Sequence, residues 1–387
     1  MRKQIPYGRQ SISGDDIKNV NRILKSDYLT QGPTIEKLER KISKFCKSKY
    51  SVAVNSATSA LHISCLALGL KKNQILWTSP ISFTASANCA LHCGAKVDFI
   101  DIDLDTFNIC PLKLEQKLKN TSKKKRPSIL VVVHLGGLSC DMIKIKKLSQ
   151  KYKFKIIEDA SHAIGSKQKN VPVGSCKYSD IAIFSFHPVK IITTGEGGVI
   201  TTNQLKLYET LKLLREHGIQ KNQSKIIGKV DGPWFYQQQN LGFNFRMSDI
   251  HAILGVSQIR KVKNFLKIRQ KIAKLYIDKL SKHPIKFQKV NKDYFSSYHL
   301  FIIRVSKNIR LKLFNYLRKK KINVNLHYIP IYKHIFYKKK FNFKNNYLKN
   351  SEEYYKSAIS IPIYPGLKKK NQIFVIKVIS NFFKNEK

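Results

Sequence analysis

The 387-residue chain has no uninterrupted apolar run long enough to span a bilayer, and its mean hydropathy is -0.30. Residues 1–7 carry charge, but no apolar segment of the kind found in signal peptides follows them, so we expect no secretion. The seven cysteines are an odd number without regular spacing, which suits a reducing compartment better than a disulfide framework. These absences together predict a cytoplasmic protein.

Several common sequence motifs are also missing. There is no Walker A lysine loop and no Gly-x-Gly-x-x-Gly fingerprint, which weighs against a nucleoside triphosphatase and against a dehydrogenase. Cys89, His92 and Cys93 fall within one helical turn, but a structural zinc needs four ligands and no second Cys/His pair has suitable spacing. We therefore predict no metal site and interpret these three residues as small side chains on a core helix face.

Acidic residues are scarce, because 24 Asp and Glu stand against 72 Lys and Arg and give a formal net charge of +48. A basic chain attracts polyanions, but nucleic-acid binders usually concentrate charge on one face or alternate it with stacking aromatics. Here lysines recur along the whole length together with abundant Ile and Asn, as an AT-biased genome would produce. We therefore predict a solvated lysine surface that could help capture an anionic substrate, and no specific nucleic-acid partner.

Strand-like and helical segments alternate from residue 35 to about 205, which predicts an α/β fold with a mostly parallel sheet and helices on both faces. Seven strands are predicted, at residues 50–54, 74–77, 96–100, 128–133, 154–157, 181–184 and 198–202. Helices are predicted between several of them, at residues 59–68, 83–91 and 142–152. A further helix should run from an N-cap at Ser248 to about Lys263.

After residue 263 the sequence pattern changes to that of lysine-rich helices and short strands, such as residues 298–305. We therefore predict two domains. Residues 1–263 would form a large α/β domain with an N-terminal arm, and residues 264–387 a smaller α+β domain.

Lys190 follows the apolar stretch 181–184 and precedes a glycine cluster at residues 195–198. A lysine that is partly desolvated at the mouth of a strand can lose its proton near neutral pH and attack a carbonyl carbon. The surroundings of Lys190 therefore favour Schiff-base chemistry.

Two other loops follow predicted strands, where ligands of parallel sheets bind. Residues 55–60 place small hydroxyl side chains and free backbone N–H groups at a helix start, which suits a phosphate, although capping alone is the better explanation of this loop by itself. Asp159 ends an apolar strand, where an ionised carboxylate is costly unless it is paired. Either a pyridinium nitrogen or the capping of a helix would account for it.

Phe83 and Asn244 occupy two more loops. Phe83 could stack on a planar cofactor ring or fill the core at the start of a helix. Asn244 lies in a Gly/Asn turn before a helix, where it could cap that helix or donate a hydrogen bond to a phosphate.

Five motifs, taken in order, resemble the DegT/DnrJ/EryC1/StrS family of pyridoxal-phosphate-dependent sugar aminotransferases. They are residues 55–60, 158–162, 184–190, 195–198 and 242–246, and the likeness covers nearly the whole chain. The resemblance implies the fold type I architecture, with a large seven-stranded sheet, and pyridoxal 5′-phosphate as the cofactor.

The resemblance also implies roles for individual residues. Lys190 would be the catalytic residue, joined to the cofactor as a Schiff base and then moving the proton between the cofactor and the substrate carbon. Asp159 would pair with the pyridine nitrogen, His162 would lie near the ring hydroxyl, and Phe83 would stack on the ring. The cofactor phosphate would be bound within the subunit by Ala57, Thr58 and Ser185.

Asn244 in such enzymes reaches the phosphate of the other subunit, so the resemblance implies a homodimer with shared active sites. Motifs such as residues 28–32, 79–83 and 327–332 resemble the family members that serve pseudaminic acid synthesis. Those members aminate C4 of a UDP-linked 4-keto sugar with L-glutamate as donor, and the product enters a surface glycan. Sugar-nucleotide contacts would then fall on Tyr7, Asp27, Tyr28, Leu29, Thr30, Asn325, Leu326, His327 and Tyr328.

Two alternatives remain open at this point. One keeps the cofactor and changes the sugar, as in a GDP-perosamine or dTDP-amino-sugar aminotransferase. The other belongs to a different class, a non-catalytic pyridoxal-phosphate-binding regulator or a nucleic-acid binder, and is motivated by the net charge of +48.

Overall fold

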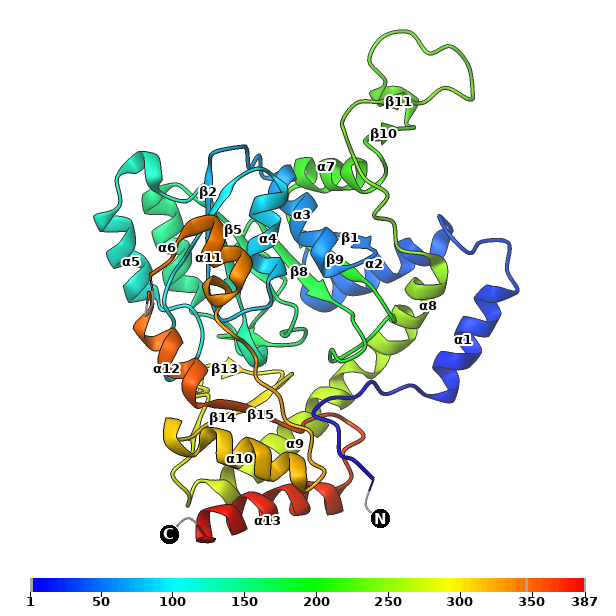
Figure 1. Cartoon of the computed structure of the whole chain (residues 1–387). Coiled ribbons are helices and arrows are strands. Elements are labelled where there is room, and N and C mark those ends of the chain that lie inside the picture. The colour runs from blue at the N-terminus through cyan, green and yellow to red at the C-terminus, as the bar shows by residue number, and fades with distance from the viewer. Residues whose placement is uncertain (1–2, 345–346, 386–387) are drawn as a thin grey trace.

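The structure is a computed structural model that describes residues 3–344 and 347–385. Its centre is a seven-stranded sheet in the order β1-β9-β8-β5-β4-β2-β3 (Figure 1). The strands are β1 (Tyr50–Val54), β2 (Ile75–Thr78), β3 (Lys96–Phe99), β4 (Ile129–Val133), β5 (Lys155–Asp159), β8 (Ile181–Ser185) and β9 (Gly198–Thr202). In this sheet β9 runs antiparallel to both of its neighbours and the other pairings are parallel.

Each of the seven strands overlaps one that the sequence predicts, and the α/β class is confirmed. The central strand β4, with the sequence Ile-Leu-Val-Val-Val, is buried along its whole length. A continuous apolar run of this kind is typical of a strand that is covered on both faces.

Helices cover both faces of the sheet. On one face the apolar core is shared with α3 (Ala57–Ala67), α4 (Ala85–His92) and α7 (Leu205–Arg215). On the other face it is shared with α2 (Pro33–Cys46), α5 (Pro111–Asn120), α6 (Met142–Tyr152) and α8 (Asp249–Gln258). The helix α1 (Gly14–Leu24) packs against α8.

The starts of α3 and α8 are fixed by hydroxyl caps. Ser56 Oγ accepts a hydrogen bond from the N–H of Ser59 at 3.1 Å, and Ser248 Oγ accepts one from the N–H of His251 at 3.3 Å. The N-cap predicted at Ser248 is therefore confirmed. The predicted helix to about Lys263 is shorter than expected, because a 3₁₀ turn at Ile259–Lys261 separates α8 from α9 (Val262–Leu280).

The helix α9 connects the large sheet with a second core. Its first turns join the core beneath α2 and α8, whereas its later turns pack in a separate apolar cluster. That cluster is covered by a three-stranded antiparallel sheet of β12 (Lys286–Phe287), β14 (Phe301–Arg304) and β15 (Ala358–Ile361) and by α10 (Lys307–Lys319) and α13 (Lys369–Asn385). Ile5 of the N-terminal arm is buried in the same cluster. The predicted domain division after residue 263 falls in the first turn of α9 and stays a prediction.

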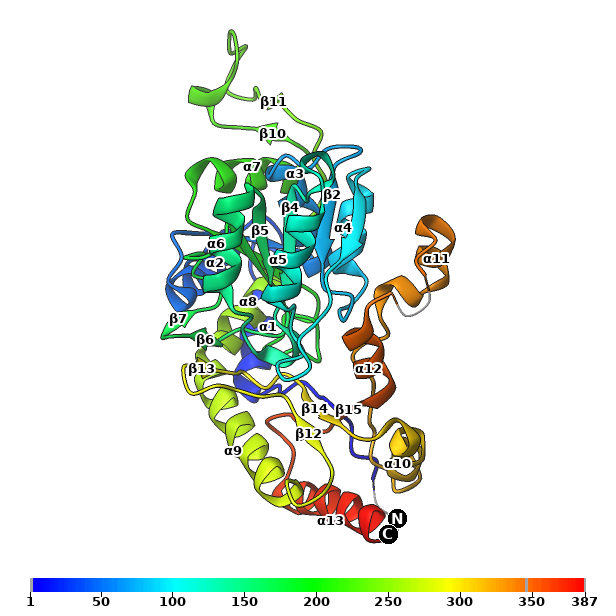
Figure 2. The same ribbon diagram turned by 90° about the vertical axis from the view of Figure 1, so that its left-hand side faces the viewer.

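Two helices return from the C-terminal part toward the large sheet, as Figure 2 shows. They are α11 (Ile335–Phe341) and α12 (Lys349–Ser357). Tyr337 of α11 is buried in the core over α3 and α4 and donates a hydrogen bond to Asn88 Oδ1 at 2.5 Å. This return brings residues 325–334 over the carboxyl edge of the large sheet.

Five short strands complete the fold. A small sheet joins β6 (Lys167–Gln168), β7 (Val171–Pro172) and β13 (Tyr294–Phe295). The hairpin of β10 (Ile219–Gln220) and β11 (Gln237–Gln238) projects away from the rest of the chain (Figures 1 and 2). Within the described ranges, no helix combines the length and the apolar character needed to cross a membrane.

Candidate active site

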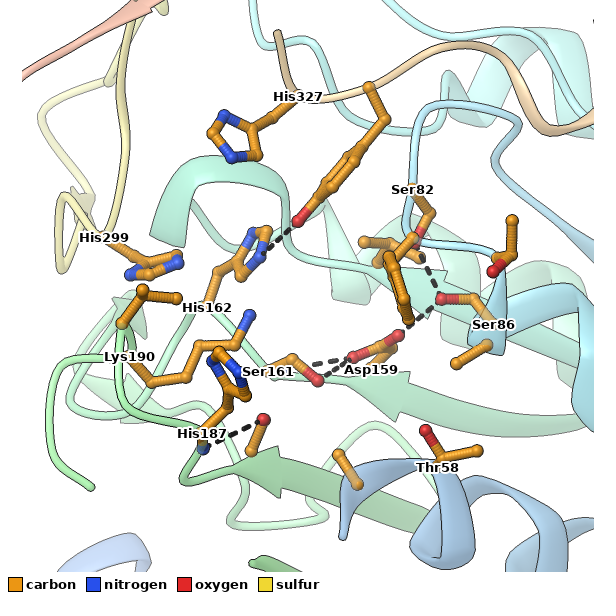
Figure 3. A pocket seen from close by; sticks show the side chains of 18 of the residues that line it. Thr58, Ser82, Ser86, Asp159, Ser161, His162, His187, Lys190, His299 and His327 are labelled. Atoms are coloured by element: carbon orange, nitrogen blue, oxygen red, sulfur yellow. Dashed lines mark hydrogen bonds between the residues drawn. The ribbon is translucent and has the colours of Figure 1, made fainter. Parts of the chain in front are cut away.

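A cavity of about 510 Å³ opens at the carboxyl edge of the large sheet. Its walls are the loops that follow β1, β2, β5 and β8, together with residues 325–329 and Tyr7 from the N-terminal arm. The cavity therefore lies where ligands of parallel sheets bind. Figure 3 shows its side chains from close by.

Lys190 extends toward the centre of this cavity from the loop after β8 (Figure 3). The residue is half-buried. Burial of its amine lowers the pKa of Lys190 to about 8, and the negative charge of nearby Asp159 opposes this shift. Among the described residues, Nζ of Lys190 has neither a hydrogen-bond acceptor nor an ion-pair partner. An amine in this environment is available as a nucleophile and as a base near neutral pH.

Asp159, the last residue of β5, is 5% exposed, and the side-chain and backbone donors that hold its carboxylate in residues 3–344 and 347–385 are neutral. Ser86 Oγ donates to its Oδ2 at 2.6 Å, and Ser161 donates to its Oδ1 through Oγ at 2.6 Å and through its N–H at 3.2 Å. Ser82 extends the chain through an Oγ–Oγ hydrogen bond of 2.7 Å to Ser86. A buried carboxylate without a cationic protein partner in the described structure suits a ligand that brings a positive charge.

Three buried histidines, His162, His299 and His327, form the wall on the side of the C-terminal part. The ring centroids of His162 and His299 are 4.4 Å apart. Burial, with nearby Lys190 adding to it, lowers the pKa of all three, and that of His327 to about 3. They are therefore neutral at physiological pH and place no positive charge beside the Lys190 amine.

The orientation of the His162 ring is fixed at both nitrogens. The N–H of Gly136 donates to Nδ1 at 3.4 Å, and Nε2 lies 3.1 Å from the hydroxyl of Tyr328. Since Nδ1 accepts, the neutral ring carries its proton on Nε2, directed at the Tyr328 oxygen.

The first turn of α3 forms the opposite wall. Its N–H groups at Ala57 and Thr58 have no acceptor within the helix, and both residues line the cavity. Gly198 lets β9 approach this turn, because a Cβ there would come within 2.7 Å of the Ala57 nitrogen. Free N–H groups at a helix start suit a phosphate.

The structure gathers most of the predicted site residues around this cavity. They are Tyr7, Ala57, Thr58, Phe83, Asp159, His162, Ser185, Lys190, Asn325, Leu326, His327 and Tyr328. Phe83 lines the cavity and is 62% exposed as a residue, and its ring centroid lies 6.4 Å from that of Tyr328.

Five predicted residues lie outside the lining of this cavity. They are Asn244 and the four residues Asp27, Tyr28, Leu29 and Thr30. Residues 27–30 lie by the starts of α2 and α8, because Thr30 pairs with Ser248 and Leu29 accepts a hydrogen bond from the N–H of Asp249 at 2.9 Å. Asn244 instead pairs with Glu216, at the end of α7. The phosphate of a second subunit expected for Asn244 and the sugar-nucleotide contacts expected for residues 27–30 both stay predictions.

Sequence reasoning missed several cavity residues, among them Ser86, Ser161, His187, Glu196 and His299. Ser161 had a usable signal, because an Asp side chain commonly accepts a hydrogen bond from the backbone N–H two residues further on. His299 had none, since it reaches His162 from a distant part of the chain. No cluster of three or more His, Cys, Asp or Glu in residues 3–344 and 347–385 is arranged to hold a metal ion. Cys89 is buried, as the sequence-based interpretation of a core helix face expects, but that interpretation is wrong for His92, which is exposed.

Comparison with known proteins agrees with this geometry. The model of the DegT/DnrJ/EryC1/StrS aminotransferase family matches residues 10–380. The UDP-4-amino-4,6-dideoxy-N-acetyl-beta-L-altrosamine transaminase of Campylobacter jejuni is 39% identical over 376 residues, 96% of this chain and 95% of that one.

Two solved structures extend the likeness to the fold. Helicobacter pylori PseC, an aminotransferase involved in the biosynthesis of pseudoaminic acid, superposes with a TM-score of 0.89 at 30% identity and covers 99% of this chain and 100% of its own. A Streptococcus pneumoniae chain in its PLP form superposes with a TM-score of 0.89 at 26% identity, over 99% of both chains. These findings confirm the family, the fold type and the cofactor expected from the sequence. The chain belongs to the DegT/DnrJ/EryC1/StrS aminotransferase family and is a pyridoxal-phosphate-dependent sugar aminotransferase of fold type I.

Proposed function

We propose that the chain transfers the amino group of L-glutamate to C4 of a UDP-linked 4-keto-6-deoxy-N-acetylhexosamine. The product would be UDP-4-amino-4,6-dideoxy-N-acetyl-β-L-altrosamine, an intermediate of pseudaminic acid synthesis for a surface glycan. The observation that carries the proposal is the unpaired Lys190 amine beside the Asp159 carboxylate, in a chain 39% identical to a transaminase named for that product.

The residues of the cavity fit pyridoxal 5′-phosphate. Asp159 would hold the protonated ring nitrogen, which supplies the positive charge that its neutral donors lack. The N–H groups of Ala57 and Thr58, with the hydroxyls of Thr58 and Ser185, would bind the phosphate. Phe83 would lie against one face of the ring. When bound, the cofactor supplies an electron sink that makes the amino-bearing carbon acidic.

Lys190 would serve twice. Its amine would hold the cofactor aldehyde covalently in the resting enzyme. Once released by the donor amine, Lys190 Nζ would carry the proton between carbon 4′ of the cofactor and C4 of the sugar. Its pKa of about 8 suits both tasks, because a base near the operating pH is effective in proton transfer.

His162 and Tyr328 would position the ring rather than exchange protons with the substrate. The His162 Nε2 proton is directed at the Tyr328 oxygen, 3.1 Å away, so the Tyr328 hydroxyl proton remains available to an acceptor in the cavity. The Tyr328 hydroxyl would then donate to the ring hydroxyl of the cofactor, near which the resemblance places His162.

We further propose a homodimer with shared active sites. Asn244 and residues 27–30 do not line the cavity of their own chain, and the hairpin beyond β10 exposes apolar side chains. In the proposed dimer Asn244 would contact the phosphate of the partner subunit, and residues 27–30 would contact the sugar nucleotide.

The test is product analysis with purified UDP-, GDP- and dTDP-linked 4-keto sugars, L-glutamate and the holoenzyme, using mass spectrometry and NMR of the sugar product. We expect turnover with the UDP-linked 4-keto-6-deoxy-N-acetylhexosamine and an equal yield of 2-oxoglutarate. Turnover with only the GDP-linked or only the dTDP-linked sugar would overturn the proposed substrate and leave the transaminase class intact.

The matched variants are Lys190→Ala and Lys177→Ala, of which the second removes an exposed lysine outside the cavity. We expect Lys190→Ala to lose the visible absorbance of the covalently bound cofactor and at least about 10³-fold in turnover. Lys177→Ala should retain both. Full absorbance and turnover in Lys190→Ala would refute the central assignment.

A further inference from the structure

The long helix α9 contains a buried arginine that has no carboxylate partner in residues 3–344 and 347–385. Arg269 is 1% exposed, and its Nε has no hydrogen-bond partner in this part of the chain. Its Nη1 donates to three backbone carbonyls, which are those of Tyr298 at 3.0 Å, His299 at 3.2 Å and Ile363 at 3.0 Å. Burying a cation without a countercharge is costly, and an apolar side chain of similar volume often stabilises a fold at least as well. Stability alone is therefore a weak explanation of Arg269.

The three carbonyls lie where the pairing of β14 with β15 stops. The last pair at this end is Phe301 with Ile361, so residues 298–299 come shortly before β14 and residue 363 shortly after β15. Buried carbonyls need donors, and beyond the last strand pair the sheet does not supply them. Arg269 donates from α9 instead and thereby joins both segments to this helix.

The first of these segments is held in a strained conformation. Tyr298 has a φ of +46°, in the left-handed region that bulky side chains rarely adopt. Such a conformation costs free energy and persists only where the surrounding contacts determine it. Two contacts hold it here, because Arg269 donates to the Tyr298 carbonyl and the Tyr298 N–H donates to Ser296 Oγ at 3.2 Å. The turn places the next residue, His299, in the wall of the active-site cavity.

The His299 ring lies against the His162 ring in that wall (Figure 3). Their centroids are 4.4 Å apart, and Ser297 Oγ donates to the His162 carbonyl at 2.8 Å. His299 Nδ1 is buried and has no hydrogen-bond partner among the described residues. The place of the His299 ring therefore depends on its backbone, which Arg269 holds, and on packing against His162.

The second segment reaches the cavity through the N-terminal arm. The N–H of Ile363 donates to the carbonyl of Tyr7 at 3.1 Å, and Tyr7 lines the cavity. Arg269 itself does not line it. One buried guanidinium thus fixes the backbone behind two parts of the cavity wall, although it contacts no ligand there.

We propose that Arg269 is a positioning residue of the transamination. By holding the Tyr298–His299 turn and the Ile363 carbonyl, it would keep His162 and Tyr7 in place around the cofactor and the substrate. The inference rests on the cavity being the transaminase site and not on which keto sugar it serves.

The test compares Arg269→Met with a matched variant, Arg304→Met. Arg304 is 4% exposed and lies at the other end of β14. Its guanidinium binds the Leu104 carbonyl, Ser357 Oγ and Glu353 Oε1, and none of these three residues lines the cavity. Both variants remove a buried guanidinium, so both should unfold at a lower urea concentration than the natural chain.

The first readout is the conversion of the holoenzyme by L-glutamate alone, followed by stopped-flow absorbance. A small displacement of the groups around a reacting centre can cost about 10²-fold in rate, and we expect a loss of that order in Arg269→Met. Arg304→Met should react at nearly the natural rate. An unchanged rate in Arg269→Met, or an equal loss in Arg304→Met, would overturn the proposal. The half-reaction does not involve the sugar, so an error in the proposed sugar leaves this measurement unaffected.

The second readout needs no substrate and no cofactor. In the cofactor-free chain with ¹³C-labelled histidine rings, the NMR signals of His162 and His299 should shift in Arg269→Met and stay in place in Arg304→Met. An arginine that only stabilised the fold would leave both signals unmoved in both variants, and that result would contradict the positioning role.

A third variant does not alter the buried cation. In His299→Ala the contact of Arg269 with the backbone carbonyl of residue 299 can remain, because it does not involve the ring. We expect the glutamate half-reaction to slow by at least about tenfold and the cofactor to dissociate more readily, since His162 loses the ring that packs against it. If both quantities kept their natural values, the Tyr298–His299 turn would have no part in positioning and the proposal would be wrong.

Discussion

Lys190 lies in the loop after β8, and its burial there predicts how the rate of cofactor capture depends on pH. Only the neutral amine attacks an aldehyde, and burial lowers the pKa of Lys190 to about 8 from 10.5. Below pH 8 the amine is mostly protonated, so covalent capture of pyridoxal phosphate by the cofactor-free enzyme should speed up as pH rises. Above pH 8 the capture rate should level off.

Stopped-flow absorbance between pH 6.5 and 9.5 measures this rate, with free N-acetyl-lysine amide as the reference amine. The reference rate should keep rising across the whole range, since an unperturbed lysine has a pKa of about 10.4. A protein profile parallel to that of the reference amine would show that Lys190 is not desolvated.

The serine chain at Asp159 makes a second prediction at this scale. Ser86 is fully buried and donates directly to Asp159, whereas the Ser82 hydroxyl contacts Asp159 indirectly, through its hydrogen bond to Ser86. Removing a donor from a buried carboxylate costs about 1–3 kcal/mol, so Ser86→Ala should lower turnover roughly tenfold. Ser82→Ala, the matched control, should lose less. The measurement is the steady-state kcat of both variants. An equal loss of kcat in the two would argue that the direct hydrogen bond from Ser86 to Asp159 has no role of its own.

Individual site residues differ in how visible they are in the sequence. Lys190 and Asp159 are predictable because each ends or follows an apolar strand, and the carboxyl ends of parallel strands share one edge. The role of Ser86 could not be predicted from the sequence, because it depends on the distance between α4 and β5. His299 is hidden because its approach to His162 is produced by the packing of the C-terminal part.

At the scale of elements, a buried ion pair joins α2, β1 and α7. Arg215 Nη1 donates to Glu39 Oε1 at 2.7 Å and to the Ala53 carbonyl at 3.0 Å, and the Ala53 N–H donates to the same Glu39 oxygen at 2.8 Å. Arg215 and Glu39 are 6% and 7% exposed. This pair fastens two helices to the edge strand of the large sheet.

Removing one partner leaves an uncompensated buried charge, so Arg215→Met should lower the free energy of unfolding by about 3–5 kcal/mol. The double variant Glu39→Met with Arg215→Met should recover much of the loss, because both charges of the buried pair are then absent, although half-buried Glu216 also loses its contact with Arg215. Glu115→Gln, in the i,i+4 pair that half-buried Glu115 forms with exposed Lys119, should change stability by less than about 1 kcal/mol. Urea titration followed by circular dichroism measures all three. No recovery in the double variant would contradict the charge-burial argument.

The elements also show the limits of sequence patterns. Apolar runs located all seven strands, yet periodicity does not give strand direction. β9 runs antiparallel because the connection from β8, residues 186–197, contains no helix that could carry the chain back across the sheet. The end of α8 was missed for a similar reason, since α9 continues the helical pattern beyond a 3₁₀ turn.

At the scale of the whole molecule, the hairpin beyond β10 is the feature that the single chain leaves unexplained. Its segment exposes large apolar side chains, with Ile227 75%, Trp234 74% and Leu241 83% exposed. In the homodimer proposed above, the partner subunit would cover side chains of this kind. The resemblance led us to expect a homodimer but not this hairpin, because no local sequence pattern reveals which apolar residues a fold leaves uncovered.

If Asn244 completes the site of the partner subunit, two inactive chains should restore each other. In a dimer of one Lys190→Ala chain and one Asn244→Ala chain, one site lacks both groups and the other has both. Co-refolded or co-expressed mixtures with separate affinity tags, purified on both tags, should therefore regain up to half of the natural turnover per dimer. If Asn244 acted within its own chain, neither site would be complete and the mixed dimer would stay as inactive as its parents.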